Sequence, residues 1–183
     1  APVKEPASVP ILFLIVVVDL IGFGIIIPLL PFYAEHFQAN PRTVGLVMAC
    51  YSAAQFLAAP FWGRLSDRIG RKPVLLVSLA GAVGGYVWLG FADTLAMLIG
   101  ARLLGGFMAG NISTAFAYVA DVTTKENRAR GMGMIGAAFG LGFIAGPAIG
   151  GILAGPDPLN ADYRTPALAA AALSATALVL ALM

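Results

Sequence analysis

Long apolar stretches separated by short polar ones dominate the chain. A membrane-spanning helix needs roughly 20 mostly apolar residues, and about six stretches of that length can be read. None alternates apolar and polar positions with the period of two that a membrane β-strand requires. The pattern therefore predicts an all-α integral membrane protein with six transmembrane helices. We expect a tail over residues 1–9, a bundle over residues 10–183, and helices near residues 10–34, 43–63, 73–92, 94–120, 128–154 and 165–183.

Composition supports a membrane protein and argues against an enzyme. Of the 183 residues, 60% are hydrophobic and 11% are charged, whereas soluble domains carry about 25% charged residues. The net charge of +2 is too small to indicate a nucleic-acid partner. The sequence has no Walker A pattern, metal-ligand cluster or nucleophile elbow, and GMGMIG at 131–136 lacks the preceding strand that a dinucleotide-binding loop needs. We therefore expect no catalysis, no metal and no cofactor.

Basic residues gather on one side of the predicted membrane. Lysine and arginine are enriched in cytoplasmic loops, and the predicted helices place eight of them on one side and two on the other. This asymmetry predicts a cytoplasmic N-terminus in a multi-pass protein. The eight are Lys4, Arg64, Arg68, Arg71, Lys72, Lys125, Arg128 and Arg130, and the two are Arg42 and Arg164.

The stretch GRLSDRIGRKP, residues 63–73, places five charges between the second and third apolar stretches. Charged side chains are costly in hydrocarbon, so we predict a short solvated connection. Proline is tolerated in a first helical turn, so Pro73 is expected to start the third helix. Asp67 would then lie near the positive end of that helix. A simple membrane anchor would need only the positive charge of this stretch.

Three motifs resemble those of one transporter family. Residues 63–73 closely match the signature between the second and third helices of the major facilitator superfamily. RLLGGFMAG, residues 102–110, resembles its fourth-helix pattern of an arginine followed by spaced glycines. GLGFIAGPAIGG, residues 140–151, resembles a motif associated with proton-coupled antiporters. The chain thus resembles the N-terminal six-helix half of such a transporter, with the C-terminal half absent from it.

Within the superfamily, the chain is most similar to tetracycline and multidrug proton antiporters. The similarity lies in DLIGFGIIIPLLP of the first helix, in the second and third helices, and in GAAFGLGFIAGPAIGG of the fifth. One position departs from the pattern. Those exporters carry an acidic residue just before an aromatic one in the third helix, where this chain has Gly85 before Tyr86. Tetracycline as the substrate therefore does not follow from the resemblance.

The resemblance implies a secondary active transporter that exports drugs or small amphiphilic molecules in exchange for protons by alternating access. Its partners would be the small-molecule substrate, protons, the lipid bilayer of a bacterial inner membrane, and the missing C-terminal half or a second copy. The alternative is a transporter-derived scaffold or accessory subunit of a larger membrane complex, which moves nothing. Gly85 and the absent second half favour this alternative.

Two charges fall inside predicted spans. Asp19 is expected roughly 13 Å from the cytoplasmic edge, and Arg102 about 12 Å from the other edge, at 1.5 Å per residue. A buried ionisable group is a functional candidate by default, so Asp19 could couple protons or line the substrate path. Alternatively, Asp19 and Arg102 form a structural ion pair. Gln55 in the second span either lines a cavity or joins two helices.

A second group of candidates lies at the predicted cytoplasmic side. In the resembled family, the positions of Asp67, Arg71 and Asp121 form a charge cluster that latches the two halves together, with Gly63 allowing their close approach. Solvated anchors are the alternative. Arg128 and Arg130 are further candidates for the cluster.

Glycines recur in the predicted fifth helix. Gly142, Gly146 and Gly150 lie four residues apart, which alone would explain close packing of a neighbouring helix. Pro147 removes a backbone hydrogen bond and is expected to bend the helix. The antiporter resemblance adds a second interpretation, in which these residues and Gly151 seal the protein against leak.

Overall fold

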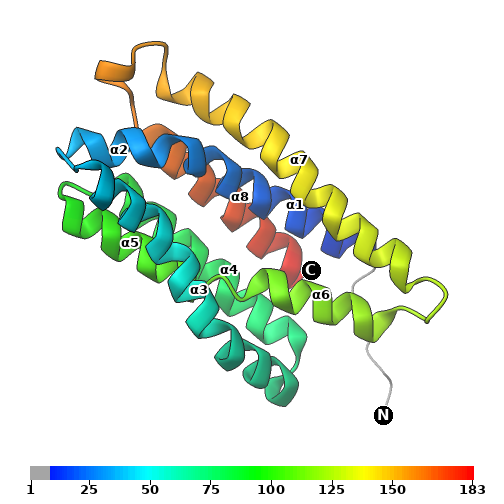
Figure 1. The fold of residues 1–183 in the computed structure, drawn as a ribbon. Helices are drawn as coiled ribbons and strands as arrows, with labels where there is room; N and C mark the ends of the chain where they lie inside the picture. Colours follow the sequence, from blue (N-terminus) through cyan, green and yellow to red (C-terminus); the bar gives the residue numbers. More distant parts are fainter. Residues whose placement is uncertain (1–8) are drawn as a thin grey trace.

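The computed structural model of the protein describes residues 9–183, so all of the predicted tail except Val9 lies outside it. Within this range the regular elements are helices (Figure 1). They comprise α1 (Val9–Ile26), η1 (Ile27–Leu29), α2 (Leu30–His36), α3 (Pro41–Ile69), α4 (Arg71–Gly90), α5 (Leu95–Phe107), α6 (Asn111–Val122), α7 (Arg128–Ala154), η2 (Pro158–Asn160) and α8 (Arg164–Leu182).

Six helical segments are long and apolar enough to cross a membrane, which confirms the predicted membrane architecture. Two of them are interrupted. The first changes to a 3-10 turn over Ile27–Leu29, which contains Pro28, a residue whose missing N–H removes one helical hydrogen bond. The fourth is broken between Phe107 and Asn111, so it consists of α5 and α6. The segments are Val9–His36, Pro41–Ile69, Arg71–Gly90, Leu95–Val122, Arg128–Ala154 and Arg164–Leu182.

The charged stretch of residues 63–73 is not the short solvated connection between helices that we predicted, because most of it is helical. Helix α3 continues to Ile69 and α4 begins at Arg71, so only Gly70 separates them. Gly70 has a φ of 96°, a conformation that favours glycine. Asp67 therefore lies in the last turn of α3, not near the start of α4, and Pro73 is the third residue of α4 rather than its first.

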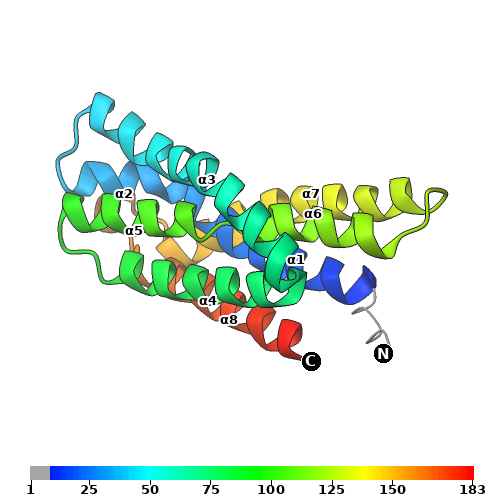
Figure 2. The same cartoon turned by 90° about the horizontal axis from the view of Figure 1, so that it is seen from below.

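Helix α1 lies against α7 on one side and α8 on the other, while α3 packs on α5 and α4 packs on both α5 and α8 (Figures 1 and 2). The turn at Gly70, the start of α1, the α6–α7 connection and the end of α8 lie toward one end of the bundle, which we call the Gly70 end. The α2–α3, α4–α5 and α7–α8 connections lie toward the opposite end.

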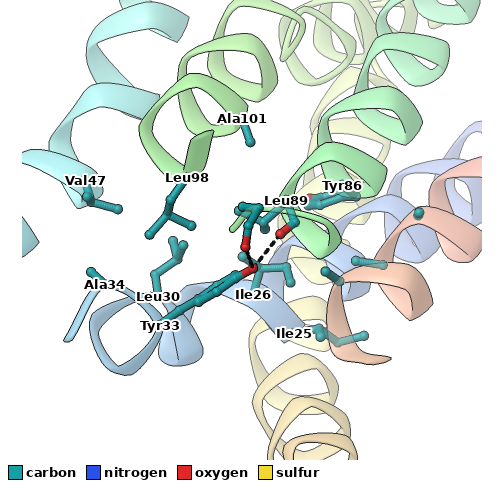
Figure 3. Close-up of a cluster of buried hydrophobic side chains, with 14 residues drawn as sticks. Ile25, Ile26, Leu30, Tyr33, Ala34, Val47, Tyr86, Leu89, Leu98 and Ala101 are labelled. Carbon is teal, nitrogen blue, oxygen red and sulfur yellow. Dashed lines mark hydrogen bonds between the residues drawn. The ribbon is translucent and has the colours of Figure 1, made fainter. Parts of the chain in front are cut away.

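Two large apolar clusters lie in the bundle, one toward each end, and a small third cluster surrounds Trp62. The cluster away from the Gly70 end packs around Tyr33 (Figure 3). The Tyr33 hydroxyl donates hydrogen bonds to the carbonyl oxygens of Leu89, at 2.8 Å, and Ala92, at 3.1 Å. These bonds satisfy two carbonyls where α4 ends and fasten α2 to α4. The second cluster includes Leu12, Leu79 and Ile135.

Asp162 caps the start of α8. Its carboxylate accepts hydrogen bonds from the backbone N–H groups of Arg164, at 2.9 Å, and Thr165, at 3.0 Å, and from the Thr165 hydroxyl. Hydrogen bonds of this kind favour the charged form, with the Thr165 hydroxyl contributing most, so the pKa of Asp162 is lowered. This cap defines the boundary of the sixth span.

Candidate functional site

Asp19 is buried in the middle of α1, with 7% of its surface exposed. Its carboxylate accepts hydrogen bonds from the Ser174 hydroxyl of α8, at 2.8 Å, and from the Asn111 side-chain amide at the start of α6. Both donors are neutral. Among residues 9–183, no arginine or lysine nitrogen lies within 4.0 Å of an Asp19 oxygen. The described residues therefore do not form the structural ion pair between Asp19 and Arg102 that was the alternative interpretation.

Arg102 is also buried, with 4% of its surface exposed. Its guanidinium lies over the ring of Tyr51 of α3, 4.3 Å from the centroid, in a cation–π contact. The Nε atom of Arg102 has no hydrogen-bond partner among the described residues. Buried polar groups rarely lack a hydrogen-bond partner, so the guanidinium keeps a donor that no described residue satisfies.

Asp19 and Arg102 line one small, partly open cavity where the two larger apolar clusters meet. Its free volume is about 20 Å³ for the centre of a water molecule, which admits roughly one water. Tyr51, Tyr86 and Asn111 contribute the other polar walls. Gly85, the position at which the chain departs from the tetracycline exporters, also lies on the wall and leaves it without an acid there.

Gln55 does not line this cavity. Its side-chain amide donates a long hydrogen bond, 3.5 Å, to the carbonyl oxygen of Ala109. Ala109 lies in the break between α5 and α6. Of the two interpretations of Gln55, the structure favours a group that joins helices.

The Asp19 site can accommodate a proton without rebuilding. A serine hydroxyl can both donate and accept a hydrogen bond, and a carboxamide offers both functions after a flip. A protonated Asp19 could therefore donate to a partner that the charged form accepts from. Arginine or lysine partners could not adapt in this way because they only donate. Neutral, reversible partners suit a carboxyl group that gains and loses a proton.

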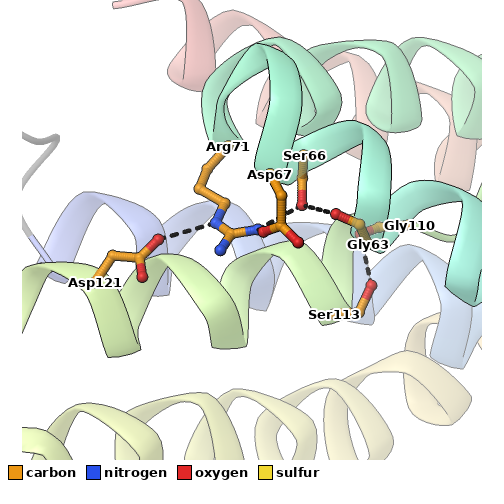
Figure 4. A network of polar contacts seen from close by, with 7 residues as sticks. All are labelled: Gly63, Ser66, Asp67, Arg71, Gly110, Ser113 and Asp121. Atoms are coloured by element: carbon orange, nitrogen blue, oxygen red, sulfur yellow. Dashed lines mark hydrogen bonds and ion pairs between the residues drawn. The ribbon is translucent and has the colours of Figure 1, made fainter.

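Three charged residues at the Gly70 end form ion pairs with one another (Figure 4). Arg71 forms ion pairs with Asp67, at 2.7 Å, and with Asp121 at the end of α6, at 2.9 Å. It also donates a hydrogen bond to the Ser66 hydroxyl, which in turn donates to the carbonyl oxygen of Gly63. The structure thus brings Asp67, Arg71 and Asp121 together as the sequence motif predicted.

Three other candidates lie outside this cluster. A Cβ added at Gly63 would meet nothing within 4 Å, so within the described residues no close approach requires this glycine. Arg128 instead donates to the carbonyl oxygen of Ala120, at 3.0 Å. Arg130 is exposed and forms no ion pair with any residue of the described range.

The five candidate residues of the fifth-helix motif divide into two groups. Gly142, Gly146 and Gly150 are buried against α1. A Cβ at Gly142 would lie 2.7 Å from the Leu20 Cβ, and one at Gly150 would lie 2.6 Å from the Ile25 carbonyl oxygen. Helix packing accounts for these three positions.

The remaining two residues of the motif play no part in this contact. Gly151 is exposed and has open space around it, and Pro147 is exposed within an uninterrupted α7. Packing therefore does not explain Gly151. Backbone hydrogen bonding continues on both sides of Pro147 in α7.

Comparison with known proteins decides the family. Residues 12–183 match the family model of the Major Facilitator Superfamily. The chain belongs to this superfamily. Its members are transporters rather than enzymes, in agreement with the expectation from composition and motifs. The match covers all six spans.

Several members of the superfamily are similar to the chain. The class C tetracycline resistance protein of Escherichia coli is 40% identical over 90% of this chain and 41% of its own length. Multidrug resistance protein 1 of Bacillus subtilis is 32% identical over 98% of this chain and 45% of its own length. The chain thus spans less than half the length of these relatives.

Two solved transporter structures share the fold. The crystal structure of the human organic anion transporter MFSD10 is 28% identical, with a TM-score of 0.78 over 99% of this chain and 47% of that protein. A POT family transporter in complex with 5-aminolevulinic acid is 18% identical, with a TM-score of 0.84 over 100% of this chain and 39% of its own. The second likeness supports the fold alone.

Sequence reasoning missed four of the residues that build these sites in this superfamily member. Asn111 and Ser174 hold Asp19, Tyr51 stacks on Arg102, and Ser66 joins the cluster of Arg71. Asn111 is a carboxamide inside an apolar span, the same signal that marked Gln55, and could have been found. Serine and tyrosine are common in spanning helices, so Ser174 and Tyr51 carry no comparable signal.

Proposed function

We propose that the chain is the N-terminal six-helix half of a secondary active transporter that exports drugs or other small amphiphilic molecules in exchange for protons. Membership of the superfamily and similarity to proteins named for tetracycline and multidrug resistance support this proposal. Substrate would bind near the membrane midplane between two six-helix halves, and rocking of one half against the other would expose it to each side in turn.

The observation that carries the proposal is the cavity around Asp19 and Arg102. Two ionisable side chains lie inside the spans without neutralising one another. Isolated charges in a membrane are expensive and mark transport pathways and proton relays. A scaffold that moved nothing would gain nothing from either charge. We therefore assign proton exchange to Asp19 and substrate contact to Arg102.

The ion pairs of Arg71 would act as a latch. Asp67 and Asp121 are well exposed, at 67% and 55% of their side-chain surface. Such pairs are weak and exchange readily with water. A contact of this kind suits a surface that closes in one state of the transport cycle and opens in the other. The open space beside Gly63 would receive a helix of the second half.

The basic residues give the orientation. The Gly70 end carries Arg64, Arg68, Lys72 and Lys125 among its exposed residues. The positive-inside rule then places this end in the cytoplasm, with the N-terminus on the same side. A bacterial inner membrane is the proposed location, because the tetracycline and multidrug resistance relatives named above come from bacteria.

Proton exchange can be measured directly. The full-length gene product that contains this chain would be reconstituted in liposomes loaded with a pH-sensitive dye. Tetracycline, ethidium and 1-naphthoate would then be added in turn under an imposed pH gradient. We expect at least one compound to drive proton movement beyond that of protein-free liposomes. If folded protein produced no additional proton movement with any of the compounds, the proposal would be contradicted.

A further inference from the structure

The guanidinium of Arg102 is a buried cation whose charge no described acid neutralises. It lies on α5 with 4% of its surface exposed, and none of its nitrogens is within 4.0 Å of a carboxylate oxygen of residues 9–183. Its Nε atom has no hydrogen-bond partner there. Burying a charge in this way is costly unless it is paired, so the site requires an anion that the described chain does not supply.

The groups around Arg102 do not meet this requirement. Asp19 shares the cavity, but neither of its oxygens lies within 4.0 Å of an Arg102 nitrogen. The remaining polar walls, Tyr51 and Tyr86, are neutral phenols. Gly85 contributes no side chain at all. The contact of the guanidinium with the Tyr51 ring covers one face and leaves the in-plane N–H donors without an acid among the described residues.

From this geometry we propose that Arg102 binds a carboxylate of the transported molecule, so that the cavity selects amphiphilic organic anions. A planar carboxylate matches the fork of N–H donors on a guanidinium and can pair with it in bidentate fashion. The inference rests on the proposed function only for the statement that the bound molecule is transported. Binding itself needs the cavity alone.

The size of the cavity sharpens the expected ligand. Free volume for roughly one water accommodates a small head group and excludes a ring system. The body of the ligand would therefore extend out of the cavity past the rings of Phe23 and Tyr51, which form part of its wall. These two rings lie 5.1 Å apart. An aromatic monocarboxylate combines the required head with a body that suits such walls.

Two nearly isosteric probes test the inference. 1-Naphthoate and 1-naphthamide differ in charge but little in shape, and their binding to the purified full-length protein can be measured by calorimetry without any gradient. We expect naphthoate to bind roughly ten- to a hundredfold more tightly, as for hydrogen bonds to a charged group. Arg102→Gln should remove this preference, and Arg102→Lys should restore part of it.

Two further variants keep the test interpretable. Arg64→Gln removes an exposed arginine of α3 and should leave the preference unchanged. Gly85→Asp places an acid on the wall of the same cavity and should weaken the binding of naphthoate but not that of naphthamide. Gly85→Ala should affect the binding of both probes equally. Each variant would be checked for a wild-type elution profile, so that Gly85→Asp and Arg102→Lys carry the test if Arg102→Gln fails to fold.

Three results would overturn the inference. They are equal binding of the two probes by the wild-type protein, no binding of either at millimolar concentration, and a preference that survives Arg102→Gln. An acid supplied to Arg102 from outside the described residues would produce the first result. Failure of the proposed function is distinguishable, because naphthoate would then bind through Arg102 without driving any proton movement.

Discussion

The cluster of Asp67, Arg71 and Asp121 at the Gly70 end differs in its pairing from the two charges in the middle of the bundle. At the Gly70 end, Arg71 pairs with Asp67 and Asp121, although both acids are more than half exposed to solvent. In the middle, Asp19 and Arg102 are almost fully buried and share a cavity, yet they do not pair. Ion pairs therefore form among exposed residues, whose charges water already solvates, and not between the two buried residues.

The difference indicates that the arrangement of Asp19 and Arg102 does not maximise the stability of the folded protein. Attraction between opposite charges strengthens as the local dielectric constant falls, so pairing would stabilise Asp19 and Arg102 more than the exposed residues. Asp19 is instead held by neutral donors, and Arg102 keeps unused donors. Groups left in this condition remain available to a proton and to a ligand. The exposed pairs are weak enough to open during a transport cycle.

The largest expected effect comes from removing the acid in the middle. Asp19→Asn keeps the shape of the side chain but cannot exchange a proton. We expect proton-driven transport to fall at least about a hundredfold, the loss typical of a positioned proton-transfer group. Ser174→Ala is the matched control, since it removes one neutral donor and should reduce transport far less. Transport under a pH gradient measures both, and an active Asp19→Asn would contradict the assignment.

A packing change next to Asp19 tests whether its position matters. A Cβ at Gly142 would press on Leu20, the residue after Asp19, and α1 would have to move. We expect Gly142→Ala to destabilise the protein by about 1–3 kcal/mol through overpacking and to reduce transport. Gly151→Ala has open space and should change neither. Thermal unfolding in detergent compares the two, and equal effects would refute the division of the α7 glycines.

The exposed cluster should show a smaller effect than buried charges would. Because Asp67 is 67% exposed, its loss should cost about 1 kcal/mol or less, a few-fold shift between outward-open and inward-open states. Arg68→Gln removes a charge outside the cluster and should have a negligible effect on this balance. Labelling of a single cysteine placed at the end of the bundle opposite the Gly70 end would report the shift in Asp67→Asn. A shift as large in Arg68→Gln would reduce the stretch to a membrane anchor.

The smallest effect concerns the cap of α8. Asp162→Ala removes hydrogen bonds to two backbone N–H groups and should cost about 1 kcal/mol, as for other helix caps. The lowered pKa of Asp162 means that this contribution is present above the ordinary aspartate pKa and is lost as the pH falls through the lowered value. In a series of melting experiments at decreasing pH, the difference in melting temperature between wild type and Asp162→Ala should disappear. A constant difference down to strongly acidic pH would argue against the cap.

Much of the fold could be predicted because a bilayer imposes length and composition on each span. Six apolar stretches gave six spans, and the paired residues Asp67, Arg71 and Asp121 followed from motif and side. The helical course of residues 63–69 could not be predicted from polarity alone, because a helix that extends beyond the hydrocarbon carries charges just as a loop does. Only the positive φ of Gly70 fixes the turn.

The candidate site was harder to predict. Depth along each span placed Asp19 and Arg102 at similar heights, which made an ion pair plausible. Height says nothing about the direction in which a side chain points, and that direction depends on how α1, α5, α6 and α8 rotate against one another. The close contact of Gly24 with Gly146 belongs to that packing. Asn111 and Ser174 reach Asp19 only because of it.

The central claim is that Asp19 and Arg102 are separate groups rather than an ion pair, and a double-mutant cycle tests it most directly. Unfolding free energies would be measured for Asp19→Asn, Arg102→Gln and the double variant of the full-length protein. We expect the two single effects to add within about 1 kcal/mol, as for groups without a direct interaction. A buried ion pair would instead leave each single variant with an uncompensated charge, at about 3–5 kcal/mol. A double variant more stable than either single variant would contradict the account.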